Sequence, residues 1–467
     1  MRKIALVLLA GVLVLSAVEW EIEQVTTGEN HWNDGSMIAL DTDGNVGIVY
    51  YQYREVEDSL MFASNATGSW VIKGIMPSAG WASFDFDSKG NAYVVLVNTY
   101  DWDDTTEIFL AADTSGEFTV TQLTNDPQDR YIPVIRLDGE DNVHIIYPQS
   151  VGEEPDDTTL LFYGWIDEGS FHYELITDQL SGHNYDMVID RNNTPHVFYT
   201  TGADFESTLW HAFRSSRSAS PDWMTEEVYT QEWGILDISA EIDAHGYFHI
   251  AHSEGWIGYI TNSSGDWTNE WASDTTEDGG IWGEFPSIAV DYLNNPHIAW
   301  PGYSSADEGY DIYYSGKTAE SWFWEKITNT PTRPEYQDER RFFVIDAQGY
   351  GHVTYSEWDE NEEFGEIFYA KSKEPFVEAI AEQPSVTNPF RLEIQCFTVS
   401  FNLSKQSTIR LDLYDASGRR VTCIASGIYA AGEHSIPINQ AELATGVYFV
   451  RLEAADYTSS AKLVVIR

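Results

Sequence analysis

The sequence predicts an all-β protein with a long repeat domain and a small C-terminal domain. A turn motif recurs at a period of ~50 residues, which is typical of stacked or radial repeat architectures. Each repeat holds short apolar segments bounded by Gly, Asn, Asp and Pro, as antiparallel hairpins do. Beyond residue 382 the repeat stops and longer segments of alternating polarity begin.

The repeated feature is an aspartate that ends one apolar segment and precedes a short turn and a second apolar segment. The seven aspartates are Asp41, Asp87, Asp138, Asp190, Asp243, Asp291 and Asp346. An aspartate can cap such a turn by accepting hydrogen bonds from backbone N–H groups. We therefore expect a structural role for all seven.

The sixth repeat shows the internal order of the elements. It contains four apolar segments, expected as strands, at 286–291, 296–300, 311–314 and 322–327. Four short strands in each ~50-residue repeat are typical of a propeller blade. Residues 18–382 are therefore predicted to form a seven-bladed β-propeller.

An additional copy of the fourth-strand pattern, with Trp20 and Val25, precedes the first repeat. The seventh repeat has its third strand near 367–370, and we expect the segment around Trp20 to pair with it. This pairing would close the ring and leave no open sheet edge. The segment around Phe376 is the alternative partner.

Residues 19–380 resemble the sialidase-like, Asp-box family of propellers. The resemblance rests on the turn between the third and fourth strands, which places a glycine before an aromatic residue at 65–70, 113–118 and 263–267. The spacing from glycine to aromatic is one residue shorter than in the family. Catalysis in the family needs an arginine cluster with a Tyr/Glu pair. The basic positions here are Arg130 and Arg340-Arg341, and they do not predict sialidase activity.

Residues 1–17 have the pattern of a signal peptide. Met1-Arg2-Lys3 is basic, 4–15 is apolar, and Ser16-Ala17 supplies a small residue for cleavage. The apolar run is short for a membrane span, although an uncleaved anchor is the alternative. No other stretch is apolar enough to span, so we expect an exported protein without a membrane span after cleavage.

The C-terminal domain follows a predicted linker at 383–390 and occupies 391–467. Alternating segments at 397–403, 408–414 and 446–452 predict a small β-sandwich. The only two cysteines, Cys396 and Cys423, lie here and are expected either as one disulfide or as two free thiols.

Residues 388–467 resemble the type A sorting domain of the type IX secretion system. The matching residues are Asn388-Pro-Phe390, Tyr414-Asp415, Gly418-Arg419, Ala431-Gly432, Thr445-Gly446-Val-Tyr448, Arg451-Leu452 and the tail from Lys462 to Arg467. The resemblance implies the type IX machinery as a partner. It also implies a secreted or outer-surface protein of a Gram-negative bacterium, often with the domain removed on export. The alternative is a generic sandwich used for adhesion.

The charge of the chain excludes one class of partner. It has 75 acidic and 25 basic residues, a formal net charge of -50. Nucleic-acid binding rests on clustered Lys and Arg, so no nucleic-acid partner is predicted.

Two patterns suggest metals, and we favour a structural interpretation of both. Asp41-Thr-Asp43-Gly-Asn45 has some features of a calcium loop, so calcium is the one cofactor considered. Five repeats place a histidine six residues after the aspartate: His144, His196, His249, His297 and His352. Zinc requires ligands ~2 Å away, which histidines in five different blades cannot supply. No metal site is predicted, and no nucleophile or phosphate-loop motif occurs.

The non-repeating loops carry the functional prediction. Loops between second and third strands share a face with the blade-joining loops, and they are strongly acidic, with Arg54 the only basic residue. The joining loops add one aromatic per blade: Trp32, Trp81, Tyr131, Tyr185, Trp233, Trp282 and Tyr336. Sugars stack on such rings, which predicts a binding module for a glycan or protein ligand. The alternatives are a glycoside hydrolase or polysaccharide lyase, a structural surface protein, and aromatics that only pack between blades.

Overall fold

The structure is a computed structural model with two compact units, Met1–Ala379 and Ile380–Arg467. The residues that it describes are 18–28, 31–54, 58–98, 106–126, 128–151, 158–182, 184–203, 206–214, 223–232, 234–275, 280–304, 309–317, 321–329, 335–336, 341–358, 365–376, 392–395, 398–403, 407–415, 420–430, 432–438, 446–454 and 457–465. The predicted linker at 383–390 and Cys396 lie outside these residues, as does the side chain of Cys423. Among the described residues, no helix is long and apolar enough to cross a membrane.

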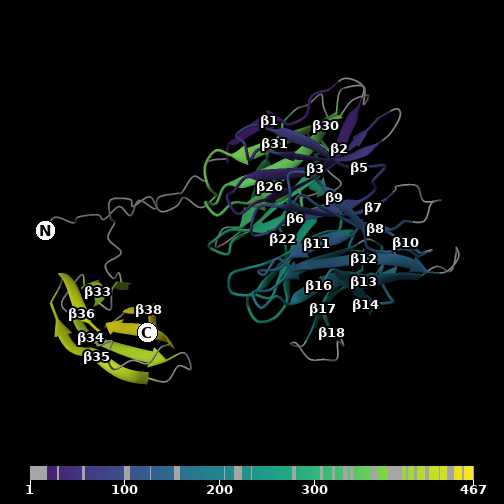
Figure 1. The fold of residues 1–467 in the computed structure, drawn as a ribbon. Coiled ribbons are helices and arrows are strands. Elements are labelled where there is room, and N and C mark those ends of the chain that lie inside the picture. The colour runs from purple at the N-terminus through teal and green to yellow at the C-terminus, as the bar shows by residue number, and fades with distance from the viewer. Residues whose placement is uncertain are drawn as a thin grey trace. The chain divides into compact units, whose positions relative to one another are not determined.

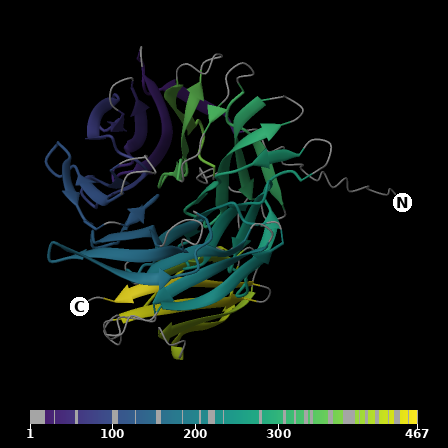
Figure 2. The same cartoon turned by 90° about the vertical axis from the view of Figure 1, so that its right-hand side faces the viewer.

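The first unit consists of antiparallel sheets arranged in a ring in sequence order, as the colours of Figure 2 show. We number them sheets 1 to 7 along the chain. Sheet 1 contains β2 (Trp32–Leu40), β3 (Val46–Tyr53), β4 (Ser59–Ser64) and β5 (Val71–Pro77), and sheet 2 contains β6 (Ala82–Phe86), β7 (Ala92–Val97), β8 (Ile108–Ala112) and β9 (Thr119–Gln122). Sheet 3 contains β10 (Asp129–Arg130), β11 (Val134–Leu137), β12 (Val143–Val151), β13 (Thr158–Asp167) and β14 (Ser170–Thr177). Sheet 4 contains β15 (Tyr185–Ile189), β16 (Pro195–Ala203), β17 (Glu206–Arg214) and β18 (Trp223–Gln231).

Sheets 5 to 7 follow the same order. Sheet 5 contains β19 (Asp237–Ile242), β20 (Phe248–Ser253), β21 (Ile257–Thr261) and β22 (Thr268–Trp271). Sheet 6 contains β23 (Ile281–Gly283), β24 (Ser287–Val290), β25 (Pro296–Ser304), β26 (Gly309–Lys317) and β27 (Trp322–Lys326). Sheet 7 contains β28 (Glu335–Tyr336), β29 (Phe343–Ile345), β30 (Gly351–Trp358), β31 (Gly365–Ser372) and β1 (Trp20–Gln24). This arrangement confirms the predicted all-β propeller.

The chain closes its ring with the N-terminal strand. β1 pairs with β31 in register from Trp20 opposite Ser372 to Gln24 opposite Phe368, and the two strands lie side by side in Figure 1. The predicted pairing of the Trp20 segment is confirmed. Phe376, the alternative, packs beside this strand, with its ring centroid 5.8 Å from that of Trp20.

Neighbouring sheets are joined by aromatic contacts as well as by aliphatic packing. The aromatic of a fourth strand meets an aromatic on the third strand of the preceding sheet, edge to face. The contacts are Trp70 with Tyr369, Phe118 with Phe62, Trp223 with Tyr163, Trp322 with Tyr259 and Trp20 with Tyr314, at centroid distances of 5.5, 5.5, 5.4, 5.1 and 5.9 Å. Such edge-to-face pairs add about 1 kcal/mol beyond area burial. Buried hydrophobic clusters join the two remaining pairs, sheets 2 and 3 and sheets 4 and 5, so both faces of each sheet are covered.

The second unit contains two sheets. One comprises β32 (Leu392–Gln395), β33 (Thr398–Leu403) and β36 (Gly432–Pro437). The other comprises β34 (Ser407–Asp415), β35 (Arg420–Tyr429), β37 (Gly446–Ala454) and β38 (Tyr457–Val465). Their facing sides share one core, in which Val399 of the first sheet meets Leu411 and Val450 of the second. This is the predicted small β-sandwich.

Candidate functional site

The seven repeated aspartates cap their own turns, as predicted. In each turn Oδ1 accepts hydrogen bonds from the backbone N–H groups two and four residues later, for example from Leu293 and Asn295 to Asp291, both at 2.8 Å. The same pair of bonds occurs at Asp41, Asp87, Asp138, Asp190, Asp243 and Asp346. These carboxylates are parts of the scaffold.

The histidines six residues later extend the same scaffold. Nε2 of His297 lies 3.3 Å from Oδ2 of Asp291, and its Nδ1 lies 2.7 Å from the Tyr314 hydroxyl on the third strand. His144, His249 and His352 have the corresponding Asp and Tyr neighbours. At His196 a second histidine, His211, replaces the tyrosine at 2.9 Å. Burial lowers the pKa of all five histidines, more than the aspartates raise it.

The calcium-like turn at Asp41 already uses its carboxylate oxygens. Oδ1 accepts from the N–H groups of Asp43 and Asn45, and Oδ2 accepts from the Asn45 side chain at 2.8 Å. Within the described part of the chain, no group of three or more His, Cys, Asp and Glu side chains is placed to hold a metal ion.

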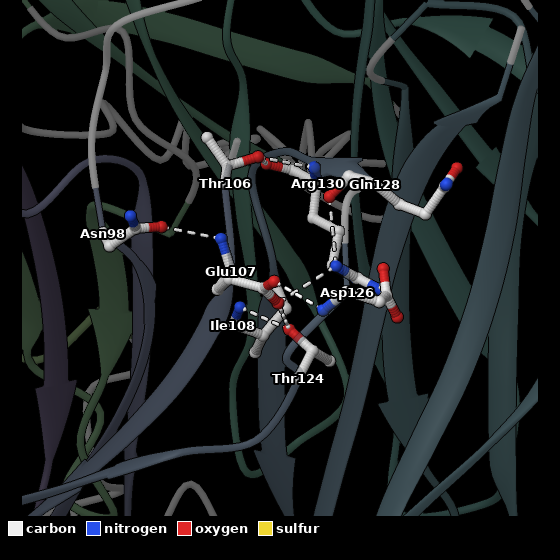
Figure 3. Close-up of polar contacts among 8 residues, drawn as sticks. All are labelled: Asn98, Thr106, Glu107, Ile108, Thr124, Asp126, Gln128 and Arg130. Carbon is white, nitrogen blue, oxygen red and sulfur yellow. Dashed lines mark hydrogen bonds and ion pairs between the residues drawn. The ribbon is translucent and has the colours of Figure 1, made fainter. Parts of the chain in front are cut away.

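Arg130, a basic position of the sialidase resemblance, lies in a buried ionic cluster in sheet 3 (Figure 3). Its side chain is 1% exposed. Its guanidinium donates to both carboxylate oxygens of Asp126, at 2.8 and 2.7 Å, and to Oε2 of Glu107 at 3.1 Å. Glu107 also accepts from the Thr124 hydroxyl, which in turn accepts from the Ile108 N–H. Arg130 thus has a structural role, and its charge is paired with two carboxylates rather than available to a ligand.

Glu107 belongs to the predicted acidic face, and two other acids of that face have similar roles. Asp311 contacts Lys326 and accepts from Thr328 at 3.3 Å. Glu366 accepts from the Gly28 N–H at 2.9 Å and from Thr26. Much of the remaining acidic loop sequence lies outside the described residues.

The centre of the ring is filled by charged side chains. Arg136 donates to Asp186 at 2.8 Å, and Arg341 lies 3.9 Å from Asp85. Burial raises the pKa of Glu241 despite both arginines nearby. Arg136, Asp186 and Arg341 line a cavity of only about 20 Å³, which is room for about one water molecule. This cavity is therefore too small for a ligand larger than water.

The predicted rim aromatics do not form one continuous platform. Tyr185 is fully buried, and its hydroxyl donates to the Ile132 carbonyl at 2.6 Å. Trp81 packs edge-on against Tyr131, with centroids 6.0 Å apart. Trp32 packs against Trp358 at 4.8 Å. These four predicted residues have packing partners in the sheets.

Trp282 differs from these four because it is exposed at the edge of a cavity. Its side chain is 58% exposed. Trp233 and the side chain of Tyr336 lie outside the described residues, so Trp282 is the predicted aromatic that the structure places in an open site.

The cavity beside Trp282 has a volume of about 270 Å³ and is formed by the loops of sheets 5 and 6. Trp282, Tyr303 and Tyr310 supply its aromatic walls, and Glu284 supplies a carboxylate. Gly255, Gly283, Phe285 and Pro301 complete the lining. Tyr310 is 48% exposed. The sequence prediction missed Tyr303 and Tyr310, although both lie between the second and third strands predicted for the sixth repeat, in a loop of the predicted acidic face.

Local backbone features position these rings. Trp282 pairs with Tyr303 across β23 and β25, which sets the two side chains on the same face. Gly255 has φ +85, and a Cβ there would lie 2.9 Å from the Trp282 ring. Phe285 also has a positive φ of 48°, a conformation that costs about 1–2 kcal/mol for such a residue and is often found at ligand sites. Trp256 packs against Trp282 at 5.1 Å and supports it.

A second, wider hollow of about 570 Å³ lies at the first turns of sheets 4 and 5. Its polar lining includes Asp190, His196 and Asp243. The two carboxylates are the turn caps described above, and Arg191, Asn192 and His245 complete the polar lining. Among the described lining residues, the one Phe, Tyr or Trp is Phe248, which is buried and offers no exposed ring. The Trp282 cavity is the better candidate for a ligand site.

Comparison with known proteins identifies the second unit. Residues 393–466 match the model of the secretion system C-terminal sorting domain. No curated protein matches the sequence.

Solved structures with related folds are distant in sequence. PorZ, an essential surface component of the type IX secretion system of Porphyromonas gingivalis, is 11% identical with a TM-score of 0.43, over 91% of this chain and 58% of its own. A puromycin-hydrolysing peptidase of Mycobacterium tuberculosis is 9% identical with a TM-score of 0.46, over 79% of this chain and 58% of its own. An α-L-arabinanase of Penicillium chrysogenum is 9% identical with a TM-score of 0.40, over 63% and 93%.

This chain spans little more than half the length of PorZ, at 58%. Similarities this weak carry no argument about activity, whereas the sorting-domain match concerns specific residues. Residues 393–466 are therefore a secretion system C-terminal sorting domain, and the protein is a secreted or cell-surface protein of a Gram-negative bacterium.

Proposed function

We propose that the propeller is an exported binding module that takes a neutral or cationic glycan in the Trp282 cavity. The observation that supports this most is the exposure of Trp282 and Tyr310, 58% and 48%, on the walls of one cavity. Large aromatics otherwise tend to be buried, and their exposure at a concave site is a mark of ligand binding.

The chemistry of the lining fits a sugar. An indole or phenol ring offers a flat apolar surface for the C–H face of a pyranose, while polar groups bind its hydroxyls. Glu284 is exposed at the cavity and can accept such hydrogen bonds. The volume is near the lower end of the range for small-molecule sites, about 300–1,000 Å³, which suits one or two sugar rings. A sugar with a positive charge would gain further from the carboxylate.

Binding is favoured over hydrolysis by the carboxylates at the cavity. Glycosidases use two carboxyl groups ~5–10 Å apart. Among the described lining residues, Glu284 is the only carboxylate. A binding module needs only this arrangement.

The test is a glycan array followed by calorimetry on the strongest hit. We expect Trp282→Ala to lower affinity about five- to thirtyfold, since stacking on one ring is worth on the order of 1–2 kcal/mol. Trp324→Ala is the matched control. Trp324 is also exposed and on sheet 6, but lies on the outermost strand β27, so its removal should leave affinity unchanged.

Three outcomes would count against the proposal. These are an array with no glycan above background, equal loss of affinity in both variants, and affinity that survives Trp282→Ala. Release of sugar from a bound glycan, abolished by Glu284→Gln, would instead identify an enzyme.

A further inference from the structure

The backbone nitrogen of Val18 contacts both carboxylate oxygens of Glu325. The distances are 2.8 Å to Oε1 and 3.0 Å to Oε2. A peptide nitrogen shares its single hydrogen between the two oxygens in a bifurcated bond, whereas an α-ammonium group has three hydrogens to donate. An α-ammonium group at this position would lie within hydrogen-bond distance of both oxygens and would form a stronger, charge-assisted pair.

In the part of the chain that the structure describes, Glu325 also has no cationic partner. Glu325 lies on β27, half-buried where sheet 6 meets the ring-closing strand. Val18 and Trp20 pack into the same core as Tyr314, Phe323 and Phe376. Among the described residues, no Lys, Arg or His forms an ion pair with Glu325.

The neighbouring charged groups already have other partners. Lys326 contacts Asp311, and Lys373 bonds Glu19 at 3.0 Å. The Tyr314 hydroxyl bonds His297. A half-buried carboxylate without a counter-charge is unfavourable, and burial raises the pKa of Glu325 to about 7.

The sequence before Val18 supplies the missing charge. Residues 1–17 have the basic, apolar and small-residue order of a signal peptide, and Ala17 is the last of them. Hydrolysis of the Ala17–Val18 bond by a signal peptidase consumes one water. It leaves a carboxylate on Ala17 and an amine on Val18, which takes up a proton below its pKa of about 8.

We infer that Val18 is the first residue of the mature protein and that its α-ammonium group forms an ion pair with Glu325. The pair fastens the start of β1 to sheet 6 and so secures the strand that closes the ring. Export and completion of the fold are thereby linked, because the cation appears only after cleavage. This inference is independent of the glycan proposal.

The first test is the intact mass and N-terminal sequence of the secreted protein, which should begin Val-Glu-Trp. The second compares Glu325→Gln in two otherwise identical chains, one beginning at Val18 and one with an N-acetylated glycine added before it, which carries no α-ammonium group. In the Val18 chain at pH 7 we expect Glu325→Gln to lower the Tm by about 2 °C. In the extended chain it should leave the Tm unchanged or raise it, because there Glu325 is a half-buried carboxylate without a cation.

Glu19→Gln is the control, since Glu19 is 74% exposed and adjacent to the same strand. It should behave alike in both chains. Competitive acetylation should also report an α-amino pKa above its ordinary value in the Val18 chain and a normal one after Glu325→Gln. A mature N-terminus at another residue would overturn the inference, as would an equal effect of Glu325→Gln in both chains.

Discussion

At the scale of single residues, the histidines of the turns show how burial controls charge. Each lies between a turn aspartate and a third-strand side chain. Burial lowers the histidine pKa, and at His196 it falls to about 4, with the nearby His211 as the next cause. Burial alone would raise the pKa of Asp291, but hydrogen bonds from His297 and Asn295 outweigh it and lower the pKa. The units are therefore expected as neutral histidine beside ionised aspartate at neutral pH.

This charge state predicts a loss of stability in mild acid. The unfolded chain binds a proton at His196 near pH 6.5, whereas the folded chain binds it only near pH 4. The contribution of neutral His196 to the free energy of unfolding is therefore fully present above about pH 6.5 and is lost as the pH falls toward 4. It amounts to about 1.4 kcal/mol for each unit of the pKa shift. Denaturant titrations at pH 7 and pH 5 should show that His196→Gln loses less stability than the wild type between these values.

The exposed His172 provides the control for this measurement. His172→Gln should lose stability with acid as the wild type does. If His196→Gln and the wild type lose equal stability between pH 7 and pH 5, His196 is not the group that titrates.

At the scale of elements, a threonine fastens the end of the fourth strand to the start of the third. In sheet 2 the Ile108 N–H donates to the Thr124 hydroxyl at 2.9 Å, and that hydroxyl donates to Glu107. Thr328 and Thr26 have the same role in sheets 6 and 7. Glu107, Asp311 and Glu366 thereby hold the loops of the predicted acidic face to the ring.

Removal of the Thr124 hydroxyl should lower the free energy of unfolding. Thr124→Val keeps the shape of the side chain but leaves the Ile108 N–H and the Glu107 carboxylate short of a partner. A buried group without its partner costs about 1–3 kcal/mol, so we expect the free energy of unfolding to fall by that amount in urea denaturation. Thr121→Val, on the exposed strand β9, should change it by less than about 0.5 kcal/mol. Equal losses in the two variants would contradict the role of Thr124.

The elements also show what the sequence could predict. The aspartate turns and the four-strand order follow from local signals, so the strands of sheet 6 and the pairing of the Trp20 segment were predicted correctly. The partners across sheets were not predictable in the same way. Trp70 meets Tyr369 and Phe118 meets Phe62, and such contacts depend on sheet order and twist rather than on neighbours in sequence.

The candidate site was only partly predictable for the same reason. Trp282 was predicted from its place in a joining loop, but Tyr185 at the equivalent place is fully buried. The difference arises from Gly255 in the preceding sheet, which admits the Trp282 ring, and from Tyr303 and Tyr310 across the cavity. A site formed by two adjacent sheets has no single sequence signature.

At the scale of the whole molecule, charge repulsion works against the compact fold. The chain carries a formal net charge of -50, and like charges repel more in the folded state than in an expanded chain. Few of the described acids have a cationic partner, since the chain has only 25 Lys and Arg for its 75 Asp and Glu. Packing between the sheets must outweigh this repulsion.

Salt should therefore stabilise the protein. The screening length falls from about 30 Å at 0.01 M ionic strength to about 10 Å at 0.1 M, so NaCl should raise the Tm steeply over this range and less above it. Scanning calorimetry at constant pH measures this, with CaCl₂ at matched ionic strength as the comparison. Because both carboxylate oxygens of Asp41 already accept hydrogen bonds within their own turn, CaCl₂ should raise the Tm little more than NaCl of the same ionic strength does. A Tm insensitive to NaCl would show that the acids are already neutralised, and a large additional rise with CaCl₂, abolished by Asp43→Asn, would establish a calcium site there.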